Sequence, residues 1–269
     1  MGPLLLGLAA FGLLNAANAE VRRFERAAAA EIGSKLQGDG KRVSVQAKVG
    51  PEGLVGDLHS VTIRASDFAT DGLPLYTEPH RSTKGLVRSL RIELTNFSLT
   101  GLPVRRLSAE IPDCRFDFAL AMRRRQIRVT RSGTGVAEVE VGEKDLEQFI
   151  RQKYTMIQRV SVRVDRDKVI VEGFGNFLRL PTEFWVAARL EASEGTKLVL
   201  SHARVLLNGK PAEPAFVDAL LKVLNPVIDL NRDLKLADAI RVDQVIQRDG
   251  ALRAKGAIQI PVRPAEAAP

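Results

Sequence analysis

The chain has very few of the side chains on which small exported domains and many enzymes depend. Its single cysteine, Cys114, excludes an intrachain disulfide and is best explained as a small buried hydrophobe, so stability must come from a packed core. The three histidines, His59, His80 and His202, lie far apart, and none has a partner at metal-ligand spacing. No Walker loop, nucleophile elbow or H-E-x-x-H motif is present. The sequence therefore gives no support to a metal, a cofactor or a nucleophilic mechanism.

Aromatic residues are also scarce, at 5% of the chain, which weakens any function based on stacking against nucleic-acid bases. Hydrophobic residues make up 45% of the 269 residues, which is enough for a sizeable core. Charge is unbalanced, because 40 Lys and Arg stand against 32 Asp and Glu and give a net charge of +8. An excess of this size favours an acidic partner, such as anionic lipid, nucleic acid or an acidic polymer.

The only long hydrophobic run is at the N-terminus. Residues 3–14 are apolar and are followed by Ala17-Asn18-Ala19, the small-residue pattern of a signal-peptide cleavage site. The run is too short to span a bilayer as a helix. It predicts a signal peptide over residues 1–19 and an exported protein of the periplasm or cell envelope, peripheral to the membrane. Because no Lys or Arg precedes the run, a misassigned start or an uncleaved anchor are the alternatives. Export favours a phospholipid or an anionic membrane surface as partner and argues against nucleic acid.

Most of the remaining chain alternates between apolar and polar residues, which is typical of strands with one buried face. In residues 87–113, two alternating runs flank a turn at residues 100–103 and predict a hairpin. In residues 115–122, the side chains of Phe116, Phe118 and Leu120 fall on one face of a predicted strand, and Cys114 is placed just before it. Further strands are predicted around residues 41–49, 54–68, 124–131, 135–141, 160–165, 168–174, 182–192, 197–207, 240–248 and 251–260, and a turn at residues 165–167 is expected to join two of them as a hairpin.

Helical periodicity appears in three segments. The first, residues 20–36, has an apolar stripe that includes Phe24 and Ile32 and ends at Gly38 and Gly40. A short helix is predicted in residues 142–154, and a longer one in residues 211–231, where Pro226 should end or kink it. About ten strands against three helices predict an α+β fold, mostly β, with an antiparallel sheet wrapped around long helices.

Two weak internal repeats accompany this pattern. Residues 58–75 are similar to residues 87–104, and residues 160–174 are similar to residues 240–256. Repetition of this kind fits two similar halves or a long regular meander. We expect a single domain over residues 20–262 and a flexible tail over residues 263–269.

The densest charge is the segment MRRRQIRVTR, which contains five arginines within residues 122–131. One explanation is a solvated strand edge, where positive charge also discourages edge-to-edge pairing. The other is an anion site, because guanidinium groups pair with phosphate oxygens through two parallel hydrogen bonds. On the second explanation Arg124, Arg125 and Arg128 are candidate contacts for a lipid headgroup. Trp185 lies on the polar face of its predicted strand, either covered by another element or placed at a membrane interface.

The order of these segments resembles the bacterial LmeA-like phospholipid-binding family. The similarity rests on the helix at residues 20–36, the two units ending in GLPL and GLPV, AEVEVGEKDLEQFI, VSVRVDRDKVIVEG, the segment 204–230 and the closing IRVDQVIQRDGALRAKG. It implies a fold similar to the tubular lipid-binding superfamily, in which a strongly curved antiparallel sheet wraps a long helix and leaves an apolar groove for acyl chains. The family has no established catalytic motif, so the resemblance implies no catalytic residue.

We therefore expect non-enzymatic binding of phospholipid at the cell envelope, with transport as a further role that such binding allows. A groove of this kind is built from apolar side chains on strands and leaves no motif. The alternatives are an envelope assembly module with a fully packed core, or an enzyme acting on a glycolipid through a pair such as Asp113 and Asp117 with a histidine. The candidate lipid-lining residues are Phe24, Ile32, Leu90, Ile92, Phe184, Val186, Phe216, Leu220 and Leu224.

Overall fold

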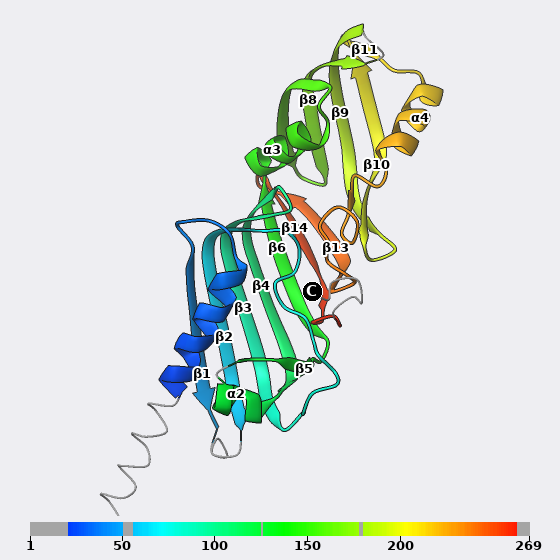
Figure 1. The fold of residues 1–269 in the computed structure, drawn as a ribbon. Coiled ribbons are helices and arrows are strands. Elements are labelled where there is room, and N and C mark those ends of the chain that lie inside the picture. The colour runs from blue at the N-terminus through cyan, green and yellow to red at the C-terminus, as the bar shows by residue number, and fades with distance from the viewer. Residues whose placement is uncertain (1–20, 51–55, 125, 178–179, 263–269) are drawn as a thin grey trace, which may run out of the picture.

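Two twisted β-sheets lie end to end and give the molecule an elongated shape with two lobes (Figure 1). The computed structural model describes residues 21–50, 56–124, 126–177 and 180–262. The predicted signal peptide (1–19), the predicted tail (263–269) and Arg125 lie outside these residues. Strands account for 56% of the described residues and helices for 18%, so the prediction of a mostly β, α+β fold is confirmed in its broad form.

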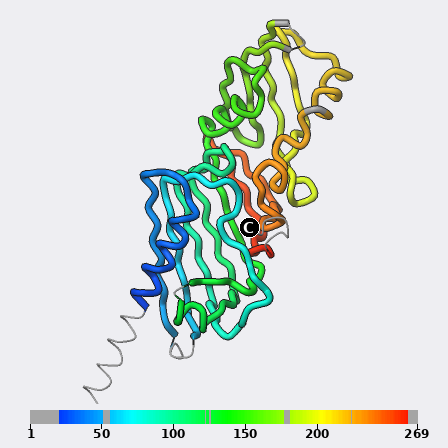
Figure 2. Tube along the Cα trace, in the orientation of Figure 1, coloured from blue at the N-terminus to red at the C-terminus, as the bar shows by residue number. Residues whose placement is uncertain are grey.

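The first sheet has the order β1-β2-β3-β4-β6-β14-β13, with β5 paired to β4. Figure 2 shows that its last strands come from distant parts of the chain, because the C-terminal β14 lies beside β6. The strands are β1 (Arg42–Val49), β2 (Asp57–Thr70), β3 (Gly85–Leu99), β4 (Leu102–Phe116), β5 (Val129–Arg131), β6 (Gly135–Gly142), β13 (Ile240–Arg248) and β14 (Ala251–Ile258).

The second sheet has the order β11-β10-β9-β8-β7, with β12 paired to β10. All its pairs are antiparallel, and the predicted hairpin at residues 165–167 joins β7 to β8. The strands are β7 (Ile157–Asp165), β8 (Lys168–Phe177), β9 (Leu180–Ser193), β10 (Lys197–Leu207), β11 (Lys210–Pro211) and β12 (Ile228–Asp229).

The helices are short and lie beside the sheets, so the prediction of a sheet wrapped around long helices is wrong. The N-terminal helix is described over residues 21–35, and the others are α2 (Phe118–Arg124), α3 (Glu143–Lys153) and α4 (Pro214–Leu224). The predicted helix over residues 211–231 stops at Leu224, because Pro226 has no N–H to donate and the next residues pair with β10. No helix in the described ranges has the length and apolar character needed to cross a bilayer.

The strand predicted over residues 115–122 is also wrong in its second half. The chain leaves β4 at Phe116 and forms α2, whose first turn is capped by Asp117. The Asp117 carboxylate accepts a hydrogen bond from the backbone N–H of Leu120, at 3.0 Å. An aspartate at this position satisfies a free N–H and favours a helix start. Cys114 lies inside β4 rather than between strands, and its predicted burial is confirmed at 2% exposure.

The first internal repeat appears as a pair of adjacent strands. β2 and β3 are parallel, and their register joins Leu58 to Val87 and Phe68 to Phe97 with a constant offset in sequence. The rings of Phe68 and Phe97 stack with centroids 5.1 Å apart. The preceding residues, Asp67 and Asn96, both have positive φ angles, of 59° and 51°. The expectation of a purely antiparallel sheet is therefore wrong for this one pair.

The core has two clusters of buried side chains. The junction core contains residues of both sheets, among them Phe68 and Val104 from the first and Val162 and Leu190 from the second. The helix-side core lies between the N-terminal helix and the first sheet. Its buried members are Ala28, Val45, Leu58, Val61, Val87, Leu90, Ile111, Cys114, Phe116, Ala121, Val129 and Ile260. The two sheets are therefore joined by shared apolar packing.

Candidate functional site

The second sheet has one face that is apolar across four strands. We call it the inner face, because it carries the second sheet's residues of the junction core. The register places Val171, Val186 and Val205 side by side, with Gly173, Phe184 and Leu207 in the next row. The inner-face side chains are Val160, Val162, Val164, Val169, Val171, Phe184, Val186, Ala188, Leu190, Ala192, Leu198, Leu200, Val205 and Leu207. Such a surface favours contact with hydrocarbon and offers no side-chain hydrogen bonds.

The inner face is fully packed only at the end that joins the first sheet. On β9, Ala188 and Leu190 are buried, whereas Phe184 and Val186 are half-buried. The same change occurs on β7 and β8, where the residues farther from the junction are half-buried. α3 packs on β7, and α4 runs beside β10 (Figure 1). The outer end of the inner face is therefore flanked by two helices and remains partly accessible.

α4 is an apolar helix that is incompletely buried. Leu220 and Leu224 are half-buried, and the side chain of Phe216 is 43% exposed. None of the described side chains of α4 belongs to either core cluster. A helix that is apolar without being packed is unusual on a soluble surface and indicates a place where an apolar ligand or surface makes contact.

An open pocket of about 510 Å³ lies at this same outer end. Phe184, Val160 and Gly173 line it, together with Trp185 and Arg159. Gly173 is needed there, because a Cβ on it would lie 2.8 Å from the Phe184 ring and 2.2 Å from the Arg159 carbonyl oxygen. The exposed Arg159 guanidinium lies over the Phe174 ring, 5.5 Å from its centroid. Its lining therefore draws on both faces of the strands and includes the Glu172 and Glu183 carboxylates beside the Arg159 cation.

Polar contacts hold the flanking helices in place without entering the inner face. Glu143 and Glu147 of α3 accept hydrogen bonds from the backbone N–H groups of Val164 and Val162, at 2.8 and 3.0 Å. These bonds cover the free edge of β7, which would otherwise be open to pairing with another chain. After α4, the Asn225 carboxamide accepts from the N–H of Leu200 and donates to its carbonyl, at 2.8 and 2.9 Å.

An ion pair ties the end of α3 to the segment that follows α4. Lys153 Nζ lies 2.7 Å from the Asp233 carboxylate and donates to the Val227 carbonyl. Burial alone would raise the pKa of Asp233, but hydrogen bonds from Arg232 and Lys153 outweigh it and lower the pKa to about 2. Asp233 is therefore charged at neutral pH, and the two flanking helical segments are connected through it.

The structure separates the nine predicted lipid-lining residues into two groups. Five lie in the second lobe, namely Phe184 and Val186 on the inner face and Phe216, Leu220 and Leu224 on α4. The other four lie in the first lobe, where Leu90 belongs to the helix-side core and Phe24, Ile32 and Ile92 pack against it. Sequence reasoning missed Val160, Val171, Leu207 and Arg159, for which strand alternation was the only available signal.

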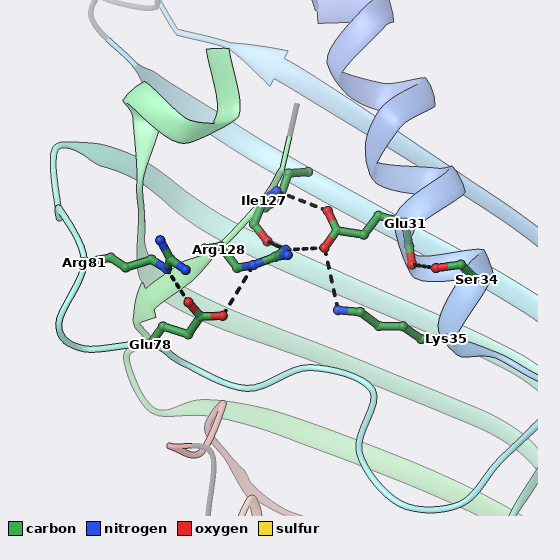
Figure 3. A network of polar contacts seen from close by, with 7 residues as sticks. All are labelled: Glu31, Ser34, Lys35, Glu78, Arg81, Ile127 and Arg128. Atoms are coloured by element: carbon green, nitrogen blue, oxygen red, sulfur yellow. Dashed lines mark hydrogen bonds and ion pairs between the residues drawn. The ribbon is translucent and has the colours of Figure 1, made fainter. Parts of the chain in front are cut away.

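The residues predicted to contact a headgroup differ in their exposure and in their ion-pair partners. Arg124 is exposed at the end of α2. Arg128 is half-buried and forms ion pairs with Glu31 and Glu78, the second at 3.3 Å (Figure 3). This network ties the segment before β5 to the N-terminal helix and accounts for Arg128 without a ligand. Trp185 is half-buried on the outer face of β9, with Glu172 and Leu206 as its cross-strand neighbours.

The residues considered for catalysis have other roles or no partners. Asp117 caps α2, and Asp113 is exposed on β4. Burial, and then the nearby Asp113 charge, raise the pKa of the Cys114 thiol to about 12, so Cys114 is not a thiolate at neutral pH. Within the described ranges, no group of three or more His, Cys, Asp and Glu side chains is arranged to hold a metal ion.

An apolar, partly accessible sheet face and a half-exposed apolar helix suit contact with an apolar ligand or surface. The family model described as LmeA-like phospholipid-binding matches residues 16–257, and the chain belongs to this family, as its sequence motifs predicted. The comparisons with curated proteins and with solved structures found no significant match.

Proposed function

We propose that this protein binds a phospholipid without chemically altering it, with the acyl chains against the outer end of the inner face and α4. The observation that carries the proposal is the combination of an apolar inner face with half-buried Phe184 and Val186 and an exposed Phe216. Membership of a phospholipid-binding family supports it independently. The headgroup is assigned to the edge of this end of the sheet, where Arg159 and Trp185 come from the opposite face of the strands and supply a cation and an indole.

The energetics of acyl chains suit such a site. Burial of each methylene contributes about 0.8 kcal/mol and needs no directional partner. About ten buried methylenes would contribute roughly 8 kcal/mol, part of which offsets the cost of ordering the ligand. Affinity of this origin requires only aliphatic and aromatic side chains on neighbouring strands, which accounts for the lack of a polar motif.

We place the protein in the periplasm or cell envelope, peripheral to a membrane, on the strength of the predicted signal peptide over residues 1–19. A carrier role follows if the bound lipid exchanges between membranes. An ion pair and backbone hydrogen bonds fix α3 and the segment after α4, whereas α4 itself contributes no described side chain to either core cluster. We therefore assign α4 as the element that moves to admit the lipid.

The experiment is native mass spectrometry with lipid extraction on protein purified from its own envelope without detergent. A phospholipid that co-purifies at a defined stoichiometry is the expected result and would identify the ligand. A clean apo mass, with no uptake from anionic vesicles, would overturn the proposal and favour an assembly module. Turnover of a glycolipid by the same preparation would instead favour the enzyme alternative.

A further inference from the structure

Two arginines face each other in the first sheet without a carboxylate to balance them. Arg115 on β4 and Arg131 on β5 are register partners, so their side chains share one face, and both are exposed. Among the described residues neither has an ion-pair partner, and Asp113, two residues before Arg115, pairs with neither. Like charges directly opposite each other destabilise a strand pair. Elsewhere in this sheet, cations pair with neighbouring carboxylates: Arg64–Glu93, Arg91–Glu110, Arg253–Glu140 and Lys255–Glu138.

This pair belongs to one end of the molecule. The rings of Phe24, Phe116 and Phe118 cluster there, with centroids 6.5 and 6.4 Å apart, and bring the start of the N-terminal helix, the end of β4 and α2 together (Figure 1). Arg115 directly precedes Phe116 in β4. We call this region the basic end, because it carries five exposed arginines that have no ion pair with any described residue: Arg22, Arg115, Arg123, Arg124 and Arg131.

The described chain also begins at the basic end, at residue 21 (Figure 1). The apolar run of residues 3–14 therefore joins the protein at this end. If that run enters a membrane as a signal or as an anchor, the basic end is the part of the described chain that follows it directly. The position of the N-terminus and the unbalanced positive charge thus both favour an anionic membrane surface as the partner of the basic end.

We propose that the basic end docks on an anionic membrane surface, with Arg115 and Arg131 together contacting lipid phosphates. A guanidinium pairs with phosphate oxygens through two hydrogen bonds, and two guanidinium groups side by side suit a surface of closely spaced phosphates. The inner face and α4 lie at the opposite end of the elongated molecule (Figure 1). A docked protein would therefore hold its lipid-binding surface away from the membrane. This orientation rests on the proposed function, whereas the docking itself does not.

The test compares two variants with equal net charge in a vesicle co-sedimentation experiment. R115Q/R131Q removes the facing pair, and R163Q/R189Q removes two exposed arginines from the outer face of the second sheet, which likewise lack an ion pair with any described residue. Both are purified from the native envelope with the same N-terminus as the wild-type protein. The vesicles contain phosphatidylglycerol in phosphatidylcholine, or phosphatidylcholine alone.

Each basic residue near an anionic surface changes affinity by about fivefold, so R115Q/R131Q should weaken binding to the anionic vesicles by roughly 10- to 30-fold. R163Q/R189Q should change it by less than about threefold, and wild-type binding should fall as salt rises. Equal losses in the two variants, or no loss in either, would overturn the proposal. Failure of the wild-type protein to bind anionic vesicles would also overturn it.

Two further measurements keep the interpretation clear. R115K/R131K retains the charge without the planar guanidinium groups, so its binding should lie between that of the wild-type protein and that of R115Q/R131Q, and a wild-type melting temperature in both variants excludes a folding defect. Uptake of a fluorescent phospholipid from neutral detergent micelles tests the lipid-binding surface separately and should be unchanged in R115Q/R131Q. Vesicle binding without uptake by the wild-type protein would contradict the proposed function and leave the docking proposal standing.

Discussion

Gln247 and Asn225 hold opposite sides of a single cross-strand pair, Leu190 and Leu200. The Gln247 carboxamide accepts from the N–H of Leu190 and donates to its carbonyl, at 3.0 and 2.9 Å, and Asn225 does the same to Leu200. Leu190 and Leu200 are register partners on β9 and β10. Each carboxamide therefore continues the hydrogen-bonding pattern of the sheet where the next strand is missing. Because Gln247 belongs to β13, its bonds also join the two sheets.

Replacement of Gln247 with leucine should destabilise the protein by about 2–4 kcal/mol. Gln247 is only 5% exposed, so the substitution leaves the backbone N–H and carbonyl of buried Leu190 without partners, at about 1–3 kcal/mol each. The free energy of unfolding from urea titration measures the effect. Gln244→Leu, at an exposed position on the same strand, is the matched control and should change stability by less than about 0.5 kcal/mol. Equal effects would show that the carboxamide does not join the sheets.

Asp233 should make the stability of the protein fall as the solution becomes acidic. Its folded-state pKa of about 2 lies below the ordinary aspartate value of 3.8, so the carboxylate stabilises the folded state above about pH 4. This contribution, about 2 kcal/mol, is lost as pH falls from about 4 to 2. Urea titrations between these pH values should show the loss in wild type and a much flatter profile in Asp233→Asn. Asp243→Asn, at an exposed position, should keep the wild-type slope.

Gly173→Ala should disturb the pocket as well as the fold. A Cβ at this position lies 2.2 Å from the Arg159 carbonyl oxygen and 2.8 Å from the Phe184 ring, so the strand or the ring must shift. Strain of this kind typically costs about 1–3 kcal/mol. We expect a lower melting temperature and weaker uptake of a fluorescent phospholipid. Gly40→Ala is the control, because a Cβ there meets no atom within 4 Å. An unchanged uptake by Gly173→Ala would show that Phe184 does not contact the lipid.

Local patterns in the sequence predicted local structure well. Alternation of apolar and polar residues predicted the positions of most strands. The similarity of residues 58–75 to residues 87–104 corresponds to β2 and β3, which pair with each other. Alternation does not distinguish parallel from antiparallel pairing, because side chains alternate with the same period in both. The missed helix α2 did have a signal, since Asp117 is followed by residues that favour a helix.

Contacts between distant segments were not predictable from one sequence. Phe24 and Phe216 both lie on apolar stripes of predicted helices, yet they occupy different lobes. The chain enters the second sheet after β6 and returns to the first sheet only at β13, and α4 falls between these points. The arginine-rich segment around Arg128 suggested an anion site. In the structure Arg128 instead pairs with Glu31, which lies 97 positions away in the sequence. Periodicity shows which face of an element is apolar, and only the packing of distant elements shows what covers that face.

Phe216→Ser should weaken lipid binding while leaving the fold nearly unchanged. Full burial of a phenylalanine side chain contributes about 1.5–3 kcal/mol, and Phe216 is 43% exposed without ligand. If the acyl chains cover it, its loss should lower phospholipid affinity by roughly 5- to 30-fold in a fluorescent-lipid titration. Ala219→Ser on the same helix is exposed and removes no large apolar surface, so its affinity should stay within about twofold of wild type. If both variants bind like the wild-type protein, α4 is not part of the lipid site, and the lipid must contact the inner face alone.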